Sequence, residues 1–133
     1  MVLKILIFYF LAYNNPAIIS TNPLINSQIP VSADQIAFTY DQPIEMSIKN
    51  ISIYKNITTG RPLLRQTIPG ALSKNFRYSE DRKTIFVDIL KSTFNEPDEN
   101  YYVVVEDNAV RNLVTHQPLV GISKGNWMFK TGK

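Results

Sequence analysis

Hydrophobic and polar residues alternate in short runs along most of the chain, and turn-forming residues recur about every 8 to 15 positions. A period of two is typical of half-buried strands, and no segment has the spacing of a long helix. The predicted strands cover residues 18–21, 35–40, 51–55, 63–68, 75–78, 84–90, 101–106 and 126–131. This pattern predicts an all-β fold, an immunoglobulin-like two-sheet β-sandwich of seven to nine strands.

The same alternation predicts which side chains fill the core between the two sheets. In the strand at 84–90, Ile85, Val87 and Ile89 share one face and point inward. The strand at 101–106 is almost wholly apolar, which is typical of a central strand covered on both faces. The predicted core residues are Ile36, Phe38, Ile53, Ile85, Val87, Ile89, Val103, Val105, Trp127 and Phe129.

The first residues form an apolar run that differs from the strands. One lysine, Lys4, is followed by nine uninterrupted apolar residues at positions 5–13. A helix of that length spans only ~14 Å, less than half of a bilayer core. A secretory signal peptide at 1–15, followed by a sandwich domain at 16–133, is therefore expected. The alternatives are a first buried strand or the tail of a preceding domain.

Composition supports one folded domain. The chain has 133 residues, of which 44% are hydrophobic and 19% charged, which excludes disordered and fibrous classes. There is no cysteine, so neither a disulfide framework nor a thiolate zinc site holds the fold together.

The net charge of +3 is unevenly distributed along the chain. Residues 49–91 carry nine Lys and Arg against three acids, whereas residues 92–110 carry five acids and no base. We expect the two blocks to interleave when the strands pair, although such blocks also steer charged partners. Dense basic and aromatic motifs for nucleic acid are lacking, so no nucleic-acid partner is expected.

The sequence contains few residues or motifs that indicate catalysis or metal binding. The single histidine, His116, has no nucleophile elbow or phosphate loop beside it, and no catalytic residues are predicted. A sandwich of related outline binds copper through His and Met ligands. This chain has one His, and two of its three Met, Met46 and Met128, lie in or near predicted strands, so no copper site is expected. The weak calcium candidates flank the strand at 101–106, so we expect them to lie at opposite ends of the sandwich as solvated loop acids. They are Asp98, Glu99, Asp107 and Asn108. No metal and no cofactor are predicted.

Two further groups of residues are candidate surface sites. Tyr54, Tyr102 and His116 form a possible ligand surface together with the long, irregular connection expected at 107–124. Trp127 is expected in the core instead. Asn50 and Asn56 each begin an N-glycosylation sequon, which matters only in a eukaryotic source.

Several short sequence segments resemble the SbsA-type bacterial immunoglobulin-like domain family, and they occur in the same order as in that family. The opening is carried by Pro16–Pro23, Ile29–Ser32 and the phrase IAFTYDQPI at 36–44. Later strands resemble the family at 51–53, 83–87, 101–105 and 126–131. The chain departs from the family at 112–116, which reads NLVTH without the family's glycine and aspartate. The resemblance implies a secreted or cell-surface module without intrinsic catalysis.

The expected function is that of a secreted or cell-surface structural spacer or protein-interaction module, with a role such as adhesion and no enzymatic activity. The alternative is a carbohydrate- or small-ligand-binding module that uses exposed tyrosines and the 107–124 connection. The expected partners are other proteins or cell-wall or extracellular polysaccharide, and no stable membrane span is expected.

Overall fold

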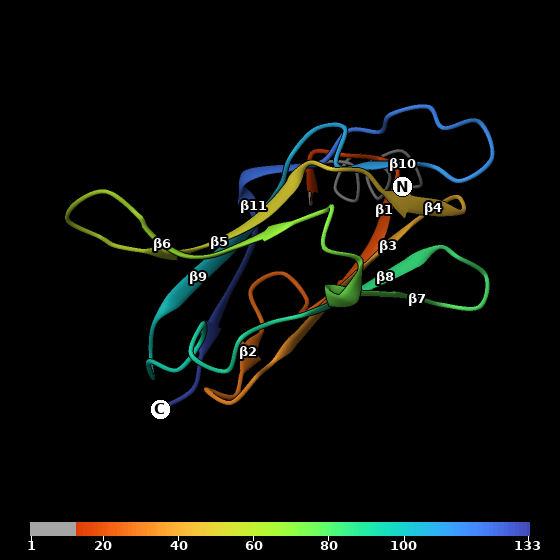
Figure 1. Cartoon of the computed structure of the whole chain (residues 1–133). Coiled ribbons are helices and arrows are strands. Elements are labelled where there is room, and N and C mark those ends of the chain that lie inside the picture. Colours follow the sequence, from red (N-terminus) through yellow and green to blue (C-terminus); the bar gives the residue numbers. More distant parts are fainter. Residues whose placement is uncertain (1–12) are drawn as a thin grey trace, which may run out of the picture.

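The computed structural model describes residues 13–133, which form an all-β domain (Figure 1). The strands are β1 (Ile18–Asn22), β2 (Gln28–Ile29), β3 (Gln35–Tyr40), β4 (Ile44–Met46), β5 (Asn50–Asn56), β6 (Leu63–Pro69), β7 (Phe76–Tyr78), β8 (Thr84–Asp88), β9 (Asn100–Val105), β10 (Val110–Asn112) and β11 (Ile122–Thr131). A short 3₁₀ helix, η1 (Ser73–Asn75), precedes β7. The predicted all-β class is confirmed.

Two sheets face each other and enclose the core, which makes the fold a β-sandwich. The four-stranded sheet has the order β1-β3-β8-β7, and the five-stranded sheet has the order β2-β11-β9-β5-β6. Neighbours in both sheets are antiparallel except β2 and β11, which pair in parallel. A separate pair, β4 and β10, lies beside the start of β1 at one end of the sandwich (Figure 1).

All eight predicted strands are present, but the predicted number of seven to nine is too low. The described residues contain eleven strands, and the additional ones are β2, β4 and β10. Each of these has only two or three residues, too few to show an alternating pattern. The expectation that 107–124 is irregular is also wrong in part. That segment contains β10, a bridge between Arg111 and Pro118, and the start of β11.

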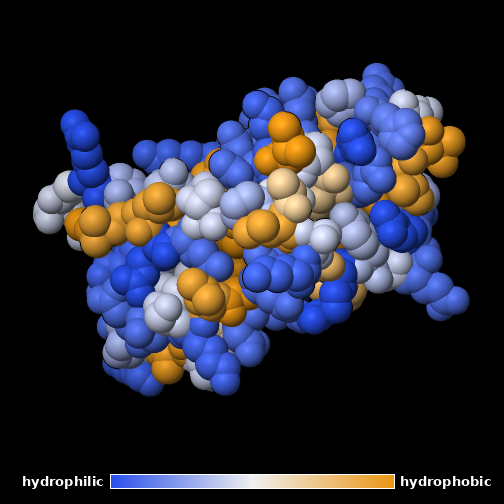
Figure 2. Space-filling model, in the orientation of Figure 1, coloured by the Kyte–Doolittle hydropathy of each residue, from blue (hydrophilic) through white to orange (hydrophobic). Residues whose placement is uncertain are grey.

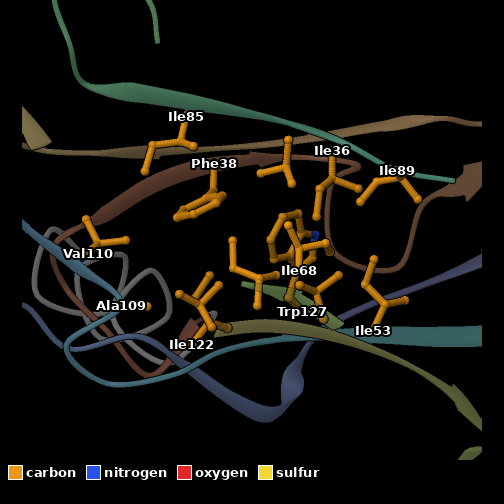
Figure 3. Close-up of a cluster of buried hydrophobic side chains, with 14 of the residues drawn as sticks. Ile36, Phe38, Ile53, Ile68, Ile85, Ile89, Ala109, Val110, Ile122 and Trp127 are labelled. Atoms are coloured by element: carbon orange, nitrogen blue, oxygen red, sulfur yellow. The ribbon is translucent and has the colours of Figure 1, made fainter. Parts of the chain in front are cut away.

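The core lies between the two large sheets, with apolar side chains pointing from both sheets into the gap (Figure 3). All ten residues predicted for the core are buried, none more than 5% exposed. Trp127 is fully buried, and its ring packs against Phe38 and Phe129 at centroid distances of 5.9 and 6.4 Å. Its Nε1 donates a 2.8 Å hydrogen bond to the carbonyl oxygen of Pro23, so the buried indole N–H is satisfied.

Tyr13 and Asn15, which the sequence pattern assigns to the leader, pack into the domain, whereas Asn14 between them is exposed. Tyr13 is 6% exposed, and its hydroxyl lies 3.0 Å from the Thr21 hydroxyl. The buried amide of Asn15 donates to the carbonyl oxygens of Val120 and Gly121, both at 2.8 Å. The remainder of the predicted signal peptide, residues 1–12, lies outside the described part of the chain. Within residues 13–133, no helix has the length and apolar character needed to cross a bilayer.

Candidate binding groove on the five-stranded sheet

A row of apolar side chains crosses the outer face of the five-stranded sheet. The strand register aligns Leu64 of β6, Tyr54 of β5, Tyr102 of β9 and Met128 of β11. Their chain neighbours Ile53, Val103 and Trp127 are fully buried in the core, so alternation turns the row to the opposite face. Neighbouring strands lie ~4.8 Å apart, so a row across four strands is ~14 Å long. We refer to these four residues as the outer row.

Tyr54 and Tyr102 form the centre of the outer row. Their rings stack at a centroid distance of 5.1 Å and an interplanar angle of 18°. Tyr54 is half-buried, whereas Tyr102 is only 3% exposed. The expectation that both tyrosines are exposed is therefore wrong for Tyr102, because the neighbouring strands and the stacked ring of Tyr54 cover it. This burial raises the pKa of Tyr102 above its usual value.

The tyrosine pair lies in a shallow, open groove with a volume of about 410 Å³. The residues that line the groove are Tyr54, Arg61, Pro62, Tyr102, Val104 and Lys124. Arg61 and Pro62 come from the β5–β6 connection, and Lys124 comes from the first half of β11. No acidic side chain lines this groove. Its walls therefore combine an apolar floor with two positive charges.

Most of the acidic side chains of residues 92–110 form ion pairs with cations outside the groove. Lys55 Nζ lies 3.0 Å from Glu96 and 3.8 Å from Glu99, and Arg65 lies 2.8 Å from Glu96. The hydrogen bond with Glu96 raises the pKa of Lys55 and lowers that of Glu96. This interleaving of the basic and acidic blocks agrees with the sequence-based expectation. Arg61 and Lys124, in contrast, have no ion pair within residues 13–133.

His116 lies away from the tyrosines, in the turn that follows β10. Its Nδ1 is 3.0 Å from a carboxylate oxygen of Glu45 in β4, which also accepts a 2.6 Å hydrogen bond from Arg111. Burial opposes ionisation of Glu45, but the hydrogen bonds from His116 and Arg111 outweigh it and lower the pKa of this carboxyl. The arrangement is a surface ion-pair cluster that ties β4 to β10, and His116 is 62% exposed at its rim.

Within residues 13–133, His116 and the two methionines, Met46 and Met128, do not come together into a copper-type site. Met46 belongs to β4, beside the strand that leads to His116, whereas Met128 lies in the outer row of the other sheet. Across residues 13–133, no group of three or more His, Asp or Glu side chains is placed to hold a metal ion.

The calcium candidates lie at opposite ends of β9, as the strand length predicts. Asp98 and Glu99 precede β9, and both face cations, since Lys130 is 4.0 Å from Asp98 and Lys55 is 3.8 Å from Glu99. Asp107 and Asn108 follow β9, and Asp107 accepts a hydrogen bond from the amide of Gly121. The two clusters cannot share one ion.

The two sequon asparagines are the first and last residues of β5. Asn50 is half-buried, whereas Asn56 is exposed at the end of the strand. Of the two, Asn56 is the more accessible to modification, and glycosylation remains a prediction for a eukaryotic source.

Comparison with known proteins supports the fold alone. No protein-family model matches the chain, and no curated protein matches it either. Among solved structures, the chain is similar to the crystal structure of CopC from Methylosinus trichosporium OB3b. The TM-score is 0.55 and the sequence identity 15%, over 86% of this chain and 91% of that chain. At this identity the likeness shows a shared β-sandwich fold.

Sequence reasoning found part of the groove and missed the rest. Tyr54 and Tyr102 were predicted as ligand-surface residues, and the structure brings them together. Arg61, Pro62 and Val104 were not predicted, and Lys124 was included only as the end of the 107–124 connection. The signal available in the sequence was alternation, since Ser52 and Tyr54 alternate with core residues just as Val104 and Tyr102 do.

Proposed function

We propose that this chain is a non-catalytic, immunoglobulin-like module that keeps other parts of a secreted or cell-surface protein at a fixed separation. The observation that carries this proposal is the position of the two ends of the sandwich. Asn15 is held at the end of the domain where β9 finishes, through Val120 and Gly121. Thr131 is held at the end where β9 begins, because its amide donates to the carbonyl of Glu99.

The chain therefore enters at one end of the domain and leaves at the other, as Figure 1 shows for β1 and β11. The six residues of β9 separate the two ends by about 20 Å. Modules with this arrangement can be linked in series, and each one adds its own length. A rigid core between the ends is what makes that length constant.

Both ends are fastened to the sandwich, so a force on one end reaches the other through the sheets. Gly132 donates its amide to Ile29, and the Thr131 hydroxyl donates to the carbonyl of Glu96 at 2.7 Å. At the other end, Asn15 accepts a 3.0 Å hydrogen bond from Ala17 in addition to donating two. Fastened ends suit a spacer, which must transmit position without fraying.

Single-molecule force spectroscopy tests this role. The chain has no native cysteine, so handles can be attached to Asn14→Cys and Lys133→Cys. Force between these positions runs along the strands and loads many ladder hydrogen bonds together. The expected result is one cooperative unfolding event for the whole domain. Gradual extension at low force would contradict a spacer role.

Secretion is part of the same proposal and rests on the predicted leader and the family resemblance. Because Tyr13 and Asn15 are buried in the domain, we propose that the leader is cleaved at or before residue 12 and not after residue 15. Mass spectrometry of the secreted protein should then find the mature N-terminus no later than Tyr13. A secreted protein that retains Met1 would contradict processing.

A further inference from the structure

We infer that the groove over Tyr54 and Tyr102 is a binding site for an acidic polysaccharide that carries uronate groups. This inference goes beyond the spacer role and does not depend on it. The groove lies on the outer face of the five-stranded sheet, between the two ends of the domain. A module linked at both ends would therefore leave this face accessible.

The charges of the groove favour an anionic ligand. Arg61 and Lys124 are exposed and have no carboxylate partner within residues 13–133, while Lys55 and Arg65 are paired with Glu96. Arginine binds a carboxylate through two parallel hydrogen bonds, and lysine adds a compact charge. No acidic side chain lines the groove to compete for either cation. A carboxylate-bearing ligand would supply the missing partner.

The floor of the groove favours a sugar as the carrier of that carboxylate. Tyr54, Pro62 and Val104 present ring and aliphatic carbon, on which the C–H faces of a pyranose pack. The hydroxyls of Tyr54 and Tyr102 have no hydrogen-bond partner in the described part of the chain. A hydroxyl-rich ligand can pair with the phenol that faces the groove, whereas a purely apolar ligand cannot.

The position of the groove on the face of the sheet favours a polysaccharide over an extended peptide as the ligand. An extended peptide adds to a sheet edge, where it pairs with free backbone groups. The edge strands of this sheet are β2 and β6, and β6 is the one beside the groove. Proline stands directly before β6 at Pro62 and at its last position, Pro69, where the backbone has no N–H to donate. The groove instead lies on the sheet face, across β5, β9 and β11, whose backbone groups are already paired. Recognition there depends on side chains alone.

The hydrophobic surface next to the groove is limited in extent. Figure 2 shows hydrophobic patches separated by polar side chains, one of them over the β5–β6 hairpin. Leu63 and Leu64 of β6 are 49% and 56% exposed there. A narrow apolar strip flanked by charge fits a single polymer chain better than the broad apolar surface of a protein partner.

Isothermal titration calorimetry at low salt tests the inference with oligosaccharides of polygalacturonate, alginate and hyaluronate. We expect the chain to bind at least one of them and to bind neutral dextran at least about tenfold more weakly. The double variant R61Q/K124Q should lower the affinity about tenfold or more, since it removes the charge-assisted hydrogen bonds. The matched variant K49Q/K74Q removes the same charge from exposed positions outside the groove and should change the affinity less than about threefold.

Each of three alternative results would overturn the inference. Failure of all three uronate polymers to bind would exclude the proposed ligand class. An equal loss in R61Q/K124Q and K49Q/K74Q would show unspecific charge attraction. Poly-glutamate binding as tightly, with the same sensitivity to R61Q/K124Q, would assign the groove to an acidic peptide. Both double variants change exposed side chains, so their thermal transitions should match that of the parent chain.

Discussion

Replacing Trp127 with alanine is expected to destabilise the domain by about 3–5 kcal/mol, the usual cost of truncating a large buried aromatic side chain. Trp127 is fully buried and packs against Phe38 of the opposite sheet and Phe129 of its own strand. The substitution leaves a cavity between the sheets and removes the hydrogen bond to Pro23. Since domains of this size are stable by about 5–15 kcal/mol, a large part of the total is lost.

Guanidinium denaturation measures the effect, and the adjacent residue supplies the control. Met128 is half-buried in the outer row, on the opposite face of the same strand. Met128→Ala should therefore cost about 1 kcal/mol or less, with an unchanged dependence on denaturant. An equal loss of unfolding free energy in the two variants would contradict the assignment of Trp127 and Met128 to opposite faces of β11.

Replacing Gly121 with alanine is expected to destabilise the domain by about 3 kcal/mol through steric overlap. A methyl group at this position would overlap the carbonyl oxygen of Val105 and lie 2.6 Å from that of Glu106. Both oxygens belong to the backbone, so neither can move without disturbing the end of β9. The amide of Gly121 also binds Asp107, and its carbonyl accepts from Asn15, so displacement of this residue would loosen two contacts.

Gly132→Ala is the matched control for this prediction. There the added methyl group meets only the side-chain amide of Gln28, at 2.8 Å, and a flexible side chain can turn away. The expected loss is less than about 1 kcal/mol. If thermal unfolding showed that Gly121→Ala is as stable as Gly132→Ala, the close approach of residue 121 to β9 would be wrong.

The large strands and the core were predictable from the sequence because they depend on local alternation. Gln35–Tyr40 is found with its predicted bounds, and each residue predicted for the core is buried. The short strands were not predictable, because their pairing depends on segments that are distant in sequence. β4 pairs with β10, more than 60 residues later in the chain, and neither is long enough to show a pattern of its own.

The complete set of residues that line the groove could not be predicted from the sequence for a similar reason. The tyrosines were recognisable by residue type, but their neighbours across the sheet are set by the strand register. That register shifts between Ile53 and Tyr54 on β5 and between Ile122 and Trp127 on β11. Such irregularities change which side chains lie opposite one another, and alternation alone does not locate them. The position of His116 beside β4 could not be foreseen either, because it depends on the pairing of β4 with the distant β10.

The hydrogen bonds of Asn15 and Thr131 imply that the chain enters and leaves a rigid sandwich at opposite ends. Pulsed electron resonance between spin labels tests it most directly, with one pair at Asn14→Cys and Lys133→Cys and a control pair at Asn14→Cys and Val120→Cys, all exposed sites. This arrangement should give narrow distance distributions for both pairs, with the first pair farther apart by about 20 Å. A broad distribution for the first pair, or similar distances for both pairs, would contradict it.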